Sequence, residues 1–260
     1  MKLVKTKDFA NGRVHAFKTK DGFMVETTDT FLPLYTQDAA NRQRNSLDDD
    51  CLGDRSERWM IGVSVMSVCP VGCKFCATGN MKKYRNLTAE EIVEQVMFVV
   101  NNNEERFVAA KEHKINYTRM GEPFLNIDNV KRAIRILDIL LPGTHHYIST
   151  IGVKGSDFSW IQGNITLQVS LHSLVEEKRD WLIPFHRKLS IAELGKIRTD
   201  SKLKTTLNMT LVDNSDFDIE ELKKHFDKDK FFIKLSPINI NHISEENDLG
   251  KGYIEYKNRR

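Results

Sequence analysis

Three cysteines crowded into eight residues constrain this chain more than any other feature of its sequence. A β-like run over 61–68 leads directly into the segment Cys-Pro-Val-Gly-Cys-Lys-Phe-Cys, whose thiols are Cys69, Cys73 and Cys76. Three thiolates on one loop can each bind one iron of a 4Fe–4S cluster, which normally takes four cysteines, so one iron stays open to another ligand. Pro70 and Gly72 allow the backbone to fold tightly around such a core. The fold must therefore place a strand end and this loop at one site.

A structural zinc site is the alternative reading of the same cysteines. Zinc usually takes four ligands in two closely spaced pairs. The fourth cysteine of the chain, Cys51, stands in the acidic segment 48–54. It could complete a zinc site, be a spare surface thiol, or be a small buried side chain. The spacing favours the iron–sulfur cluster over zinc, and disulfides are disfavoured for three such closely packed thiols.

The composition is that of one globular domain, with or without a small appendage. The 260 residues are 40% hydrophobic and 29% charged, with a formal net charge of +3. This mildly basic balance permits nucleic-acid binding without requiring it. Neither a signal peptide at the start nor an apolar run of membrane-spanning length is recognisable. With unpaired cysteines, we expect a cytoplasmic protein with no membrane partner.

Short apolar strands alternate with helix-like segments along the chain. The expected strands cover 61–68, 115–120, 146–151, 165–171, 205–212 and 232–237. The expected helices begin at Thr88, with Glu91 completing a capping box, at Asn126, and within 216–226. Alternation of this kind predicts an α/β fold with a parallel sheet, and six units fit a partial (β/α)6 barrel. Chemistry in such barrels gathers at the carboxyl ends of the strands, where the cysteine loop also lies.

The chain is expected to have three parts. Residues 13–17 and 22–27 flank a Lys20-Asp-Gly22 turn and predict a β-hairpin. With a polar loop over 37–58, this hairpin forms an N-terminal extension, 1–58. The partial barrel follows over 59–240, and 241–260 form a C-terminal tail.

Polar residues and glycines recur at the predicted carboxyl ends of successive strands. They are Gly121 and Glu122 after the second strand, Ser149 after the third, Ser170, Leu171 and His172 after the fourth, and Asn239 after the sixth. A fixed carboxylate such as that of Glu122 could hold an ammonium group. Each also has an ordinary structural reading, as a turn residue, a surface acid, a satisfied histidine or a cap. Their common placement is what favours a shared site.

Together these motifs resemble the RlmN/Cfr family, the radical S-adenosylmethionine (SAM) adenine methyltransferases of ribosomal and transfer RNA. The resemblance runs from about Gly22 to Asn239 and includes the cysteine run, Met120-Gly-Glu-Pro-Phe-Leu-Asn126, Ser149-Thr-Ile-Gly152, Ser170-Leu-His-Ser173 and Arg179-Asp-Trp-Leu-Ile-Pro184. It implies a radical SAM barrel in which Cys69, Cys73 and Cys76 hold a 4Fe–4S cluster. It also implies that Gly121 and Glu122 meet the amino acid part of SAM.

The resemblance completes the site with further residues. Ser149, Ser170, Leu171, His172 and Asn239 would finish the SAM pocket. Glu26 matches the family's proton-accepting glutamate and would be the catalytic residue. Its plainer reading is a solvated strand residue. An electron donor such as flavodoxin or ferredoxin is the implied partner, and RNA or a nucleotide is the implied substrate.

Several family features are missing from this sequence. The family carries its methyl group on a cysteine near the C-terminus, but no cysteine follows Cys76. A second family cysteine, seven positions before Cys69, is replaced by Gly62. The family's N-terminal helical domain also has no counterpart. We therefore expect a radical SAM enzyme that does not methylate through a thiol carrier. The alternatives are a radical activase of a partner protein and a non-catalytic, metal-stabilised RNA-binding module.

Overall fold

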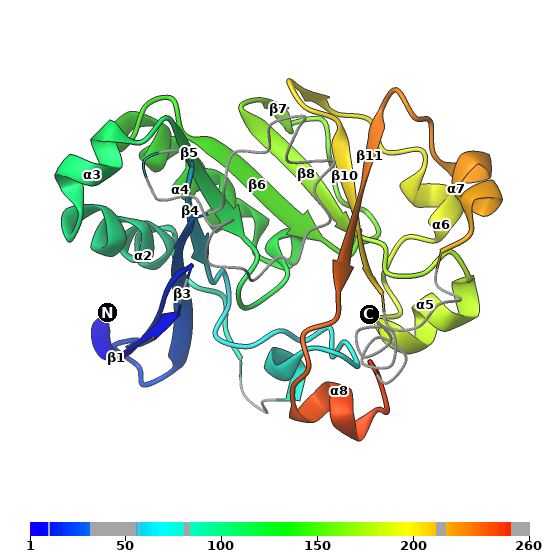
Figure 1. Ribbon diagram of the computed structural model, residues 1–260, viewed down its shortest axis with the longest axis horizontal. Coiled ribbons are helices and arrows are strands. Elements are labelled where there is room, and N and C mark those ends of the chain that lie inside the picture. The colour runs from blue at the N-terminus through cyan, green and yellow to red at the C-terminus, as the bar shows by residue number, and fades with distance from the viewer. Residues whose placement is uncertain (10, 32–55, 57, 81–83, 212–216, 251–260) are drawn as a thin grey trace, which may run out of the picture. The chain divides into compact units, whose positions relative to one another are not determined.

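A computed structural model describes residues 1–9, 11–31, 56, 58–80, 84–211 and 217–250. Nine strands form one mixed sheet in the order β1-β2-β3-β4-β5-β6-β8-β10-β11 (Figure 1). Helices alternate with its parallel strands, which confirms the predicted α/β class. The chain divides into two compact units. The first holds 1–67, 86–120 and 126–147, and the second holds 68–85, 121–125 and 148–260.

The first unit begins with three antiparallel strands, β1 (Lys2–Phe9), β2 (Gly12–Lys18) and β3 (Met24–Phe31). The predicted hairpin is confirmed, since Lys18 pairs with Met24 on either side of the turn. Strand β1 was not predicted. All its residues are exposed, and its frequent lysines are typical of an edge strand, so it lacks the buried face on which sequence patterns depend.

The rest of the first unit contains two further strands and three helices. Strand β4 (Arg58–Val63) pairs antiparallel with β3 and parallel with β5 (Glu112–Tyr117). The helices are α2 (Ala89–Asn101), α3 (Glu104–Ala109) and α4 (Ile127–Leu140). Helix α2 starts at the predicted Thr88–Glu91 capping box. Asn126 precedes α4 as predicted, but its side chain donates to the carbonyls of Val65 and Leu87 at 2.7 and 2.8 Å.

The second unit has a parallel ladder formed by β8 (Ile165–Ser170), β10 (Thr205–Leu211) and β11 (Phe231–Pro237) (Figure 1). Strand β6 (His145–Thr150) has residues in both units. A short parallel pair joins β7 (Gln162–Gly163) to β9 (Asp200–Ser201). The helices are α5 (Glu176–Leu182), α6 (Ile191–Leu194), α7 (Ile219–His225) and α8 (His242–Glu246), with 3-10 turns η2 (Ala77–Asn80) and η3 (Pro123–Leu125).

Two predicted strands end earlier than expected. The first stops at Val63 rather than at residue 68, and the second stops at Tyr117 rather than at residue 120. The amides of Val65 and Met66 instead donate to the carbonyl of Met120 at 2.8 and 3.1 Å. The segment 64–68 is fully buried beyond the end of β4, and a buried apolar run alone does not separate a strand from a loop, whereas after β5 only Met120 is buried.

Some predictions fall outside the described residues. Cys51 and most of the predicted polar loop over 37–58 lie there, although Arg58 itself begins β4. The division into 1–58, 59–240 and 241–260 stays a prediction. Among the helices that the structure describes, none is both long and apolar enough to span a bilayer.

Candidate active site

Ten of the eleven predicted site residues belong to the second unit. Glu26 is the exception and lies in β3 of the first unit. Its carboxylate forms an ion pair with Arg119, and both side chains are partly exposed. The proton-accepting role of Glu26 stays a prediction.

The cysteine loop closes on itself between β4 and η2. Gly72 has a φ of +71°, and a Cβ placed on Gly79 would lie 2.8 Å from the Gly72 Cα. A side chain at position 79 would clash with the backbone of Gly72, so the loop needs glycine there. The amide of Lys74 donates to the carbonyl of Leu182 at 2.9 Å, which attaches the loop to the end of α5.

The cysteine thiols are free and electrostatically coupled. Burial, together with the charges of Glu122 and Cys76, raises the pKa of Cys69 to about 12, against the opposing effect of the amides of Val71 and Gly121. Burial, followed by the charges of Cys69, Cys76 and Glu122, also raises the pKa of Cys73. These raised pKa values favour the neutral thiols, so ionisation of the thiols would need a compensating cation, which the irons of a 4Fe–4S cluster would supply.

The donor set therefore suits the cluster in number and chemistry. Among the described residues, no group of three or more His, Cys, Asp or Glu side chains is gathered closely enough to hold a metal ion. The assignment of Cys69, Cys73 and Cys76 as ligands accordingly rests on the motif, on the tight loop and on the coupling of the thiols.

Glu122 contributes a buried carboxylate to the candidate site. It accepts hydrogen bonds from the amides of Phe124 at 3.1 Å and Ile151 at 3.0 Å. Burial raises its pKa to about 7, against the hydrogen bonds from the Thr150 side chain and these two amides. A carboxylate has about four acceptor positions, so Glu122 retains capacity for a cationic ligand. Thr150 was not among the predicted site residues.

His172 is held in a conformation that few non-glycine residues adopt. Its φ is +59°, and its ring packs edge-on against Phe75 of the cysteine loop, with centroids 4.7 Å apart. Burial, and secondarily the charge of Arg179, lower its pKa to about 3. Its Nδ1 accepts from the Thr210 amide at 3.1 Å, so the neutral ring carries its proton on Nε2. Backbone strain at a buried polar residue is a frequent mark of a functional site.

Arg179 connects the segments around this site, and sequence reasoning missed it. Its fully buried guanidinium donates to the carbonyls of Leu171 at 3.2 Å, Leu189 at 2.7 Å and Ile151 at 2.7 Å. Burial lowers its pKa to about 10, so it stays cationic at neutral pH. The only available signal was its place in the Arg179–Pro184 motif.

The remaining predicted SAM residues each make separate contacts. Ser149 donates to Gln168 at 3.1 Å, and Ser170 is half-buried at the end of β8. Leu171 is buried, with its amide donating to the carbonyl of Asn208. Asn239 is exposed, whereas Asn241 donates to the carbonyl of Phe75 at 3.0 Å. Asn241 therefore reaches the cysteine loop, and sequence reasoning missed it.

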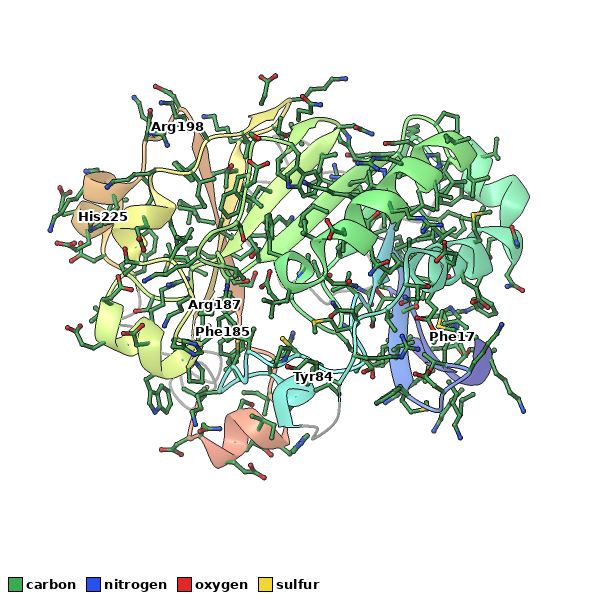
Figure 2. All side chains as sticks on the ribbon, turned by 180° about the vertical axis from the view of Figure 1, so that it is seen from behind. Phe17, Tyr84, Phe185, Arg187, Arg198 and His225 are labelled. Atoms are coloured by element: carbon green, nitrogen blue, oxygen red, sulfur yellow. The ribbon has the colours of Figure 1, made fainter. Side chains whose placement is uncertain are left out.

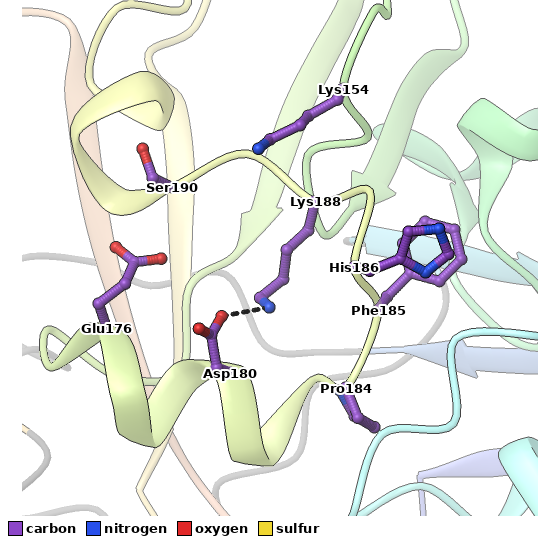
Figure 3. Close-up of a pocket in the computed structure, with 8 residues that line it drawn as sticks. All are labelled: Lys154, Glu176, Asp180, Pro184, Phe185, His186, Lys188 and Ser190. Atoms are coloured by element: carbon purple, nitrogen blue, oxygen red, sulfur yellow. Dashed lines mark ion pairs between the residues drawn. The ribbon is translucent and has the colours of Figure 1, made fainter.

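A surface cavity of about 380 Å³ lies beside α5 and is lined by residues of that helix and of the segments around Lys154 and 184–190 (Figure 3). Lys154 and Lys188 extend into it from opposite segments, and Lys188 forms an ion pair with Asp180 of α5. Phe185 and His186 form an aromatic edge, with ring centroids 5.7 Å apart. The positively and negatively charged side chains of this lining balance one another. None of the predicted SAM residues lines the cavity.

Comparison with known proteins identifies the family. The model of the radical SAM superfamily matches residues 63–226, which include the cysteine loop and the ends of β5, β6, β8 and β10. The chain belongs to the radical SAM superfamily. Members of this family use a 4Fe–4S cluster and SAM, so the predicted cofactors are those of the family.

The radical SAM relatives of this chain include RNA methyltransferases. A probable dual-specificity RNA methyltransferase RlmN of Pseudothermotoga lettingae is 34% identical over 194 residues, covering 68% of this chain and 54% of that protein. The dual-specificity RNA methyltransferase RlmN of Helicobacter hepaticus is 33% identical over 179 residues, covering 65% of this chain and 48% of that one. The chain thus spans about half the length of the curated relatives it matches.

A solved structure shares the same radical SAM fold. A radical SAM methyltransferase from Sphaerobacter thermophilus aligns with a TM-score of 0.72 and 26% identity, covering 99% of this chain and 72% of that one. The predicted barrel class is therefore confirmed.

Proposed function

We propose that this protein cleaves SAM reductively and directs the resulting radical to an RNA substrate. The observation that carries the proposal is the tight three-cysteine loop, whose half-buried thiols of Cys69 and Cys73 interact electrostatically with Glu122. When bound, a 4Fe–4S cluster supplies an electron to SAM, which separates into methionine and a 5′-deoxyadenosyl radical. The residues of the chain bind and orient SAM and keep water out of the site.

Each residue has a role that follows from its surroundings. The Glu122 carboxylate, fixed by two amides, would bind the ammonium group of SAM. The neutral His172 ring would offer its Nε2 proton as a hydrogen-bond donor next to the cysteine loop. Arg179 would hold the ends of β6 and β8 in register and place a positive charge near Cys73.

The RNA substrate is proposed from the named activities of the relatives, which is an argument by analogy. An electron donor of the flavodoxin or ferredoxin type and a reducing cytoplasmic setting complete the proposal. We further propose that the methyl-carrier route is not used. Gly62 stands where the family has its second cysteine, and a Cβ there would lie 2.3 Å from the Thr28 Oγ1, so a cysteine would require the Thr28 side chain to move.

Electron paramagnetic resonance of the reduced, anaerobically purified protein tests the SAM site. Adding SAM should change the signal of the cluster, because SAM would bind at the iron that lacks a cysteine ligand. An identical signal with and without saturating SAM would contradict the proposal.

A further inference from the structure

A second cavity, of about 400 Å³, lies at the opposite end of the same parallel strands. Its lining comes from 197–205, which lead into β10, and from 229–230, which lead into β11. The cysteine loop and His172 are associated with the carboxyl ends of these strands, whereas this cavity sits at their amino ends. Figure 2 shows Arg198 near the top of the view, well above Phe185 and Arg187.

The lining of this cavity is strongly basic. Its cations are Arg198, Lys202, Lys204 and Lys230, and its one anion is Asp229. Asp227, outside the lining, forms an ion pair with Lys230 at 3.6 Å, so positive charge is still in excess when this carboxylate is counted. The first cavity, by contrast, has balanced charges, so only this one has the electrostatic character of an anion site.

A hydrogen-bonded frame holds the basic segment in place. The amides of Asp200 and Lys202 donate to the carbonyls of Ile161 and Gly163 at 2.9 and 3.0 Å, next to the β7–β9 pair. The amide of Thr205 donates to the carbonyl of Lys230 at 3.0 Å. The two basic segments are thus joined before any ligand binds, which lowers the entropic cost of binding.

The cationic groups retain donors for a ligand. Lys204 Nζ donates to the carbonyl of Lys228 at 2.9 Å, and Arg198 Nη1 donates to the carbonyls of Gly195 and Ile197 at 2.8 and 2.7 Å. An ammonium has three N–H donors and a guanidinium has five, so both keep donors after these bonds. Thr199 and Thr205 add hydroxyl groups to the lining.

We propose that this cavity binds backbone phosphates of an RNA substrate, which rests on the function proposed above. Its lining has no aromatic ring on which a base could stack, so the cations would contact phosphates rather than bases. The seven residues of β10 extend about 20 Å, so an RNA bound here and also at the carboxyl ends of the strands would have to span several nucleotides. The site would therefore position RNA without reading its sequence.

Fluorescence anisotropy with a labelled single-stranded RNA, measured across a salt series, tests this site. We expect Lys202→Ala/Lys204→Ala to weaken binding at least tenfold at low salt. The slope of log K against log salt should become shallower by about 1.4, because each lost phosphate contact contributes about 0.7 on single strands. The matched control is Lys223→Ala/Lys224→Ala on α7, which removes the same charge from exposed lysines paired with Glu220 and Glu221. We expect the control to bind within about twofold of wild type.

Several results would overturn the assignment. These are no RNA binding by the wild type, equal losses in both double variants, or displacement of RNA by poly-glutamate as readily as by unlabelled RNA. Inorganic phosphate, at matched ionic strength, should compete only weakly if several phosphates are bound together. SAM cleavage by the wild type without RNA is measured in parallel. Cleavage without RNA binding would refute this site alone, and RNA binding without cleavage would refute the radical SAM chemistry alone.

Discussion

Glu122 determines much of the local electrostatics of the candidate site. Its burial raises its own pKa to about 7, and its charge raises the pKa values of Cys69 and Cys73. A carboxylate in that position opposes neighbouring thiolates unless cations are bound. The cluster irons and the ammonium group of SAM, both of which the family would supply, are cations and would compensate this negative charge.

Replacing Glu122 with Gln should weaken SAM binding while leaving the cluster in place. A charge-assisted hydrogen bond contributes roughly 1.5–3 kcal/mol, so the dissociation constant should rise about tenfold to hundredfold. Anaerobic calorimetry of the cluster-loaded proteins measures this. Equal affinities for wild type and variant would remove Glu122 from the SAM site.

His172 should make the apoprotein sensitive to acid. Its pKa is lowered to about 3 when folded, whereas an unfolded histidine titrates near 6.5. Below about pH 6.5 the unfolded chain binds a proton that the folded ring does not, so stability falls as pH falls. Between pH 6.5 and 5 this loss amounts to about 2 kcal/mol.

The matched variant for this test is His172→Asn, since asparagine tolerates the positive φ at this position. Urea unfolding at several pH values should show a smaller loss of stability on acidification in the variant than in the wild type. Parallel pH dependences for the two proteins would show that His172 titrates normally in the folded state.

At the scale of elements, Arg179 explains how separate segments meet at the site. One side chain of α5 bonds the ends of β6 and β8 and the segment before α6. The same helix accepts the Lys74 amide of the cysteine loop through Leu182. The position of the loop therefore depends on α5 as well as on β4.

Arg179→Lys should destabilise the protein by about 2–4 kcal/mol. A lysine has no planar fork to reach three diverging carbonyls, and each buried acceptor left unpaired costs about 1–3 kcal/mol. Arg132→Lys is the control, because its ion pair with Glu90 is exposed and should contribute little. Denaturant unfolding measures both, and equal effects would show that the three carbonyl contacts are unimportant.

The sequence predicts elements where a local pattern defines them. The six core strands and α2 follow from apolar runs and a capping box, and the cysteine loop and Glu122 follow from short motifs. Strand β1 has no buried face, and the buried loop after β4 looks like a strand. Thr150, Arg179 and Asn241 act through contacts between distant segments, such as the bond from Asn241 to Phe75, so no local pattern reveals them.

At the scale of the whole molecule, the chain has the radical SAM fold but lacks the two cysteines expected from its resemblance to the RNA methyltransferase family. Position 62 is occupied by a glycine packed against Thr28 and Arg119. No cysteine occurs from residue 77 to residue 260. A thiolate is a far better nucleophile than a Ser or Asn side chain, which supports the proposal that this chain does not use the thiol-carrier route.

We therefore expect no methylated adenine in ribosomal or transfer RNA from cells that express this chain in a background lacking native adenine methylation. Mass spectrometry of digested RNA measures this. Methyladenine that depends on Cys51 would make that residue the carrier. Methyladenine that persists in Cys51→Ala would show that methylation proceeds by a different mechanism.

Formation of 5′-deoxyadenosine is the most direct test of the central claim that this chain cleaves SAM at a three-cysteine cluster. Wild-type protein, purified without oxygen and holding about four irons and four sulfides, should convert SAM to equal amounts of methionine and 5′-deoxyadenosine when reduced. Cys73→Ala should lose most of its iron and form neither product. Stoichiometric zinc without sulfide in the anaerobic wild type, or a fully loaded and reduced cluster that leaves SAM intact, would contradict the account.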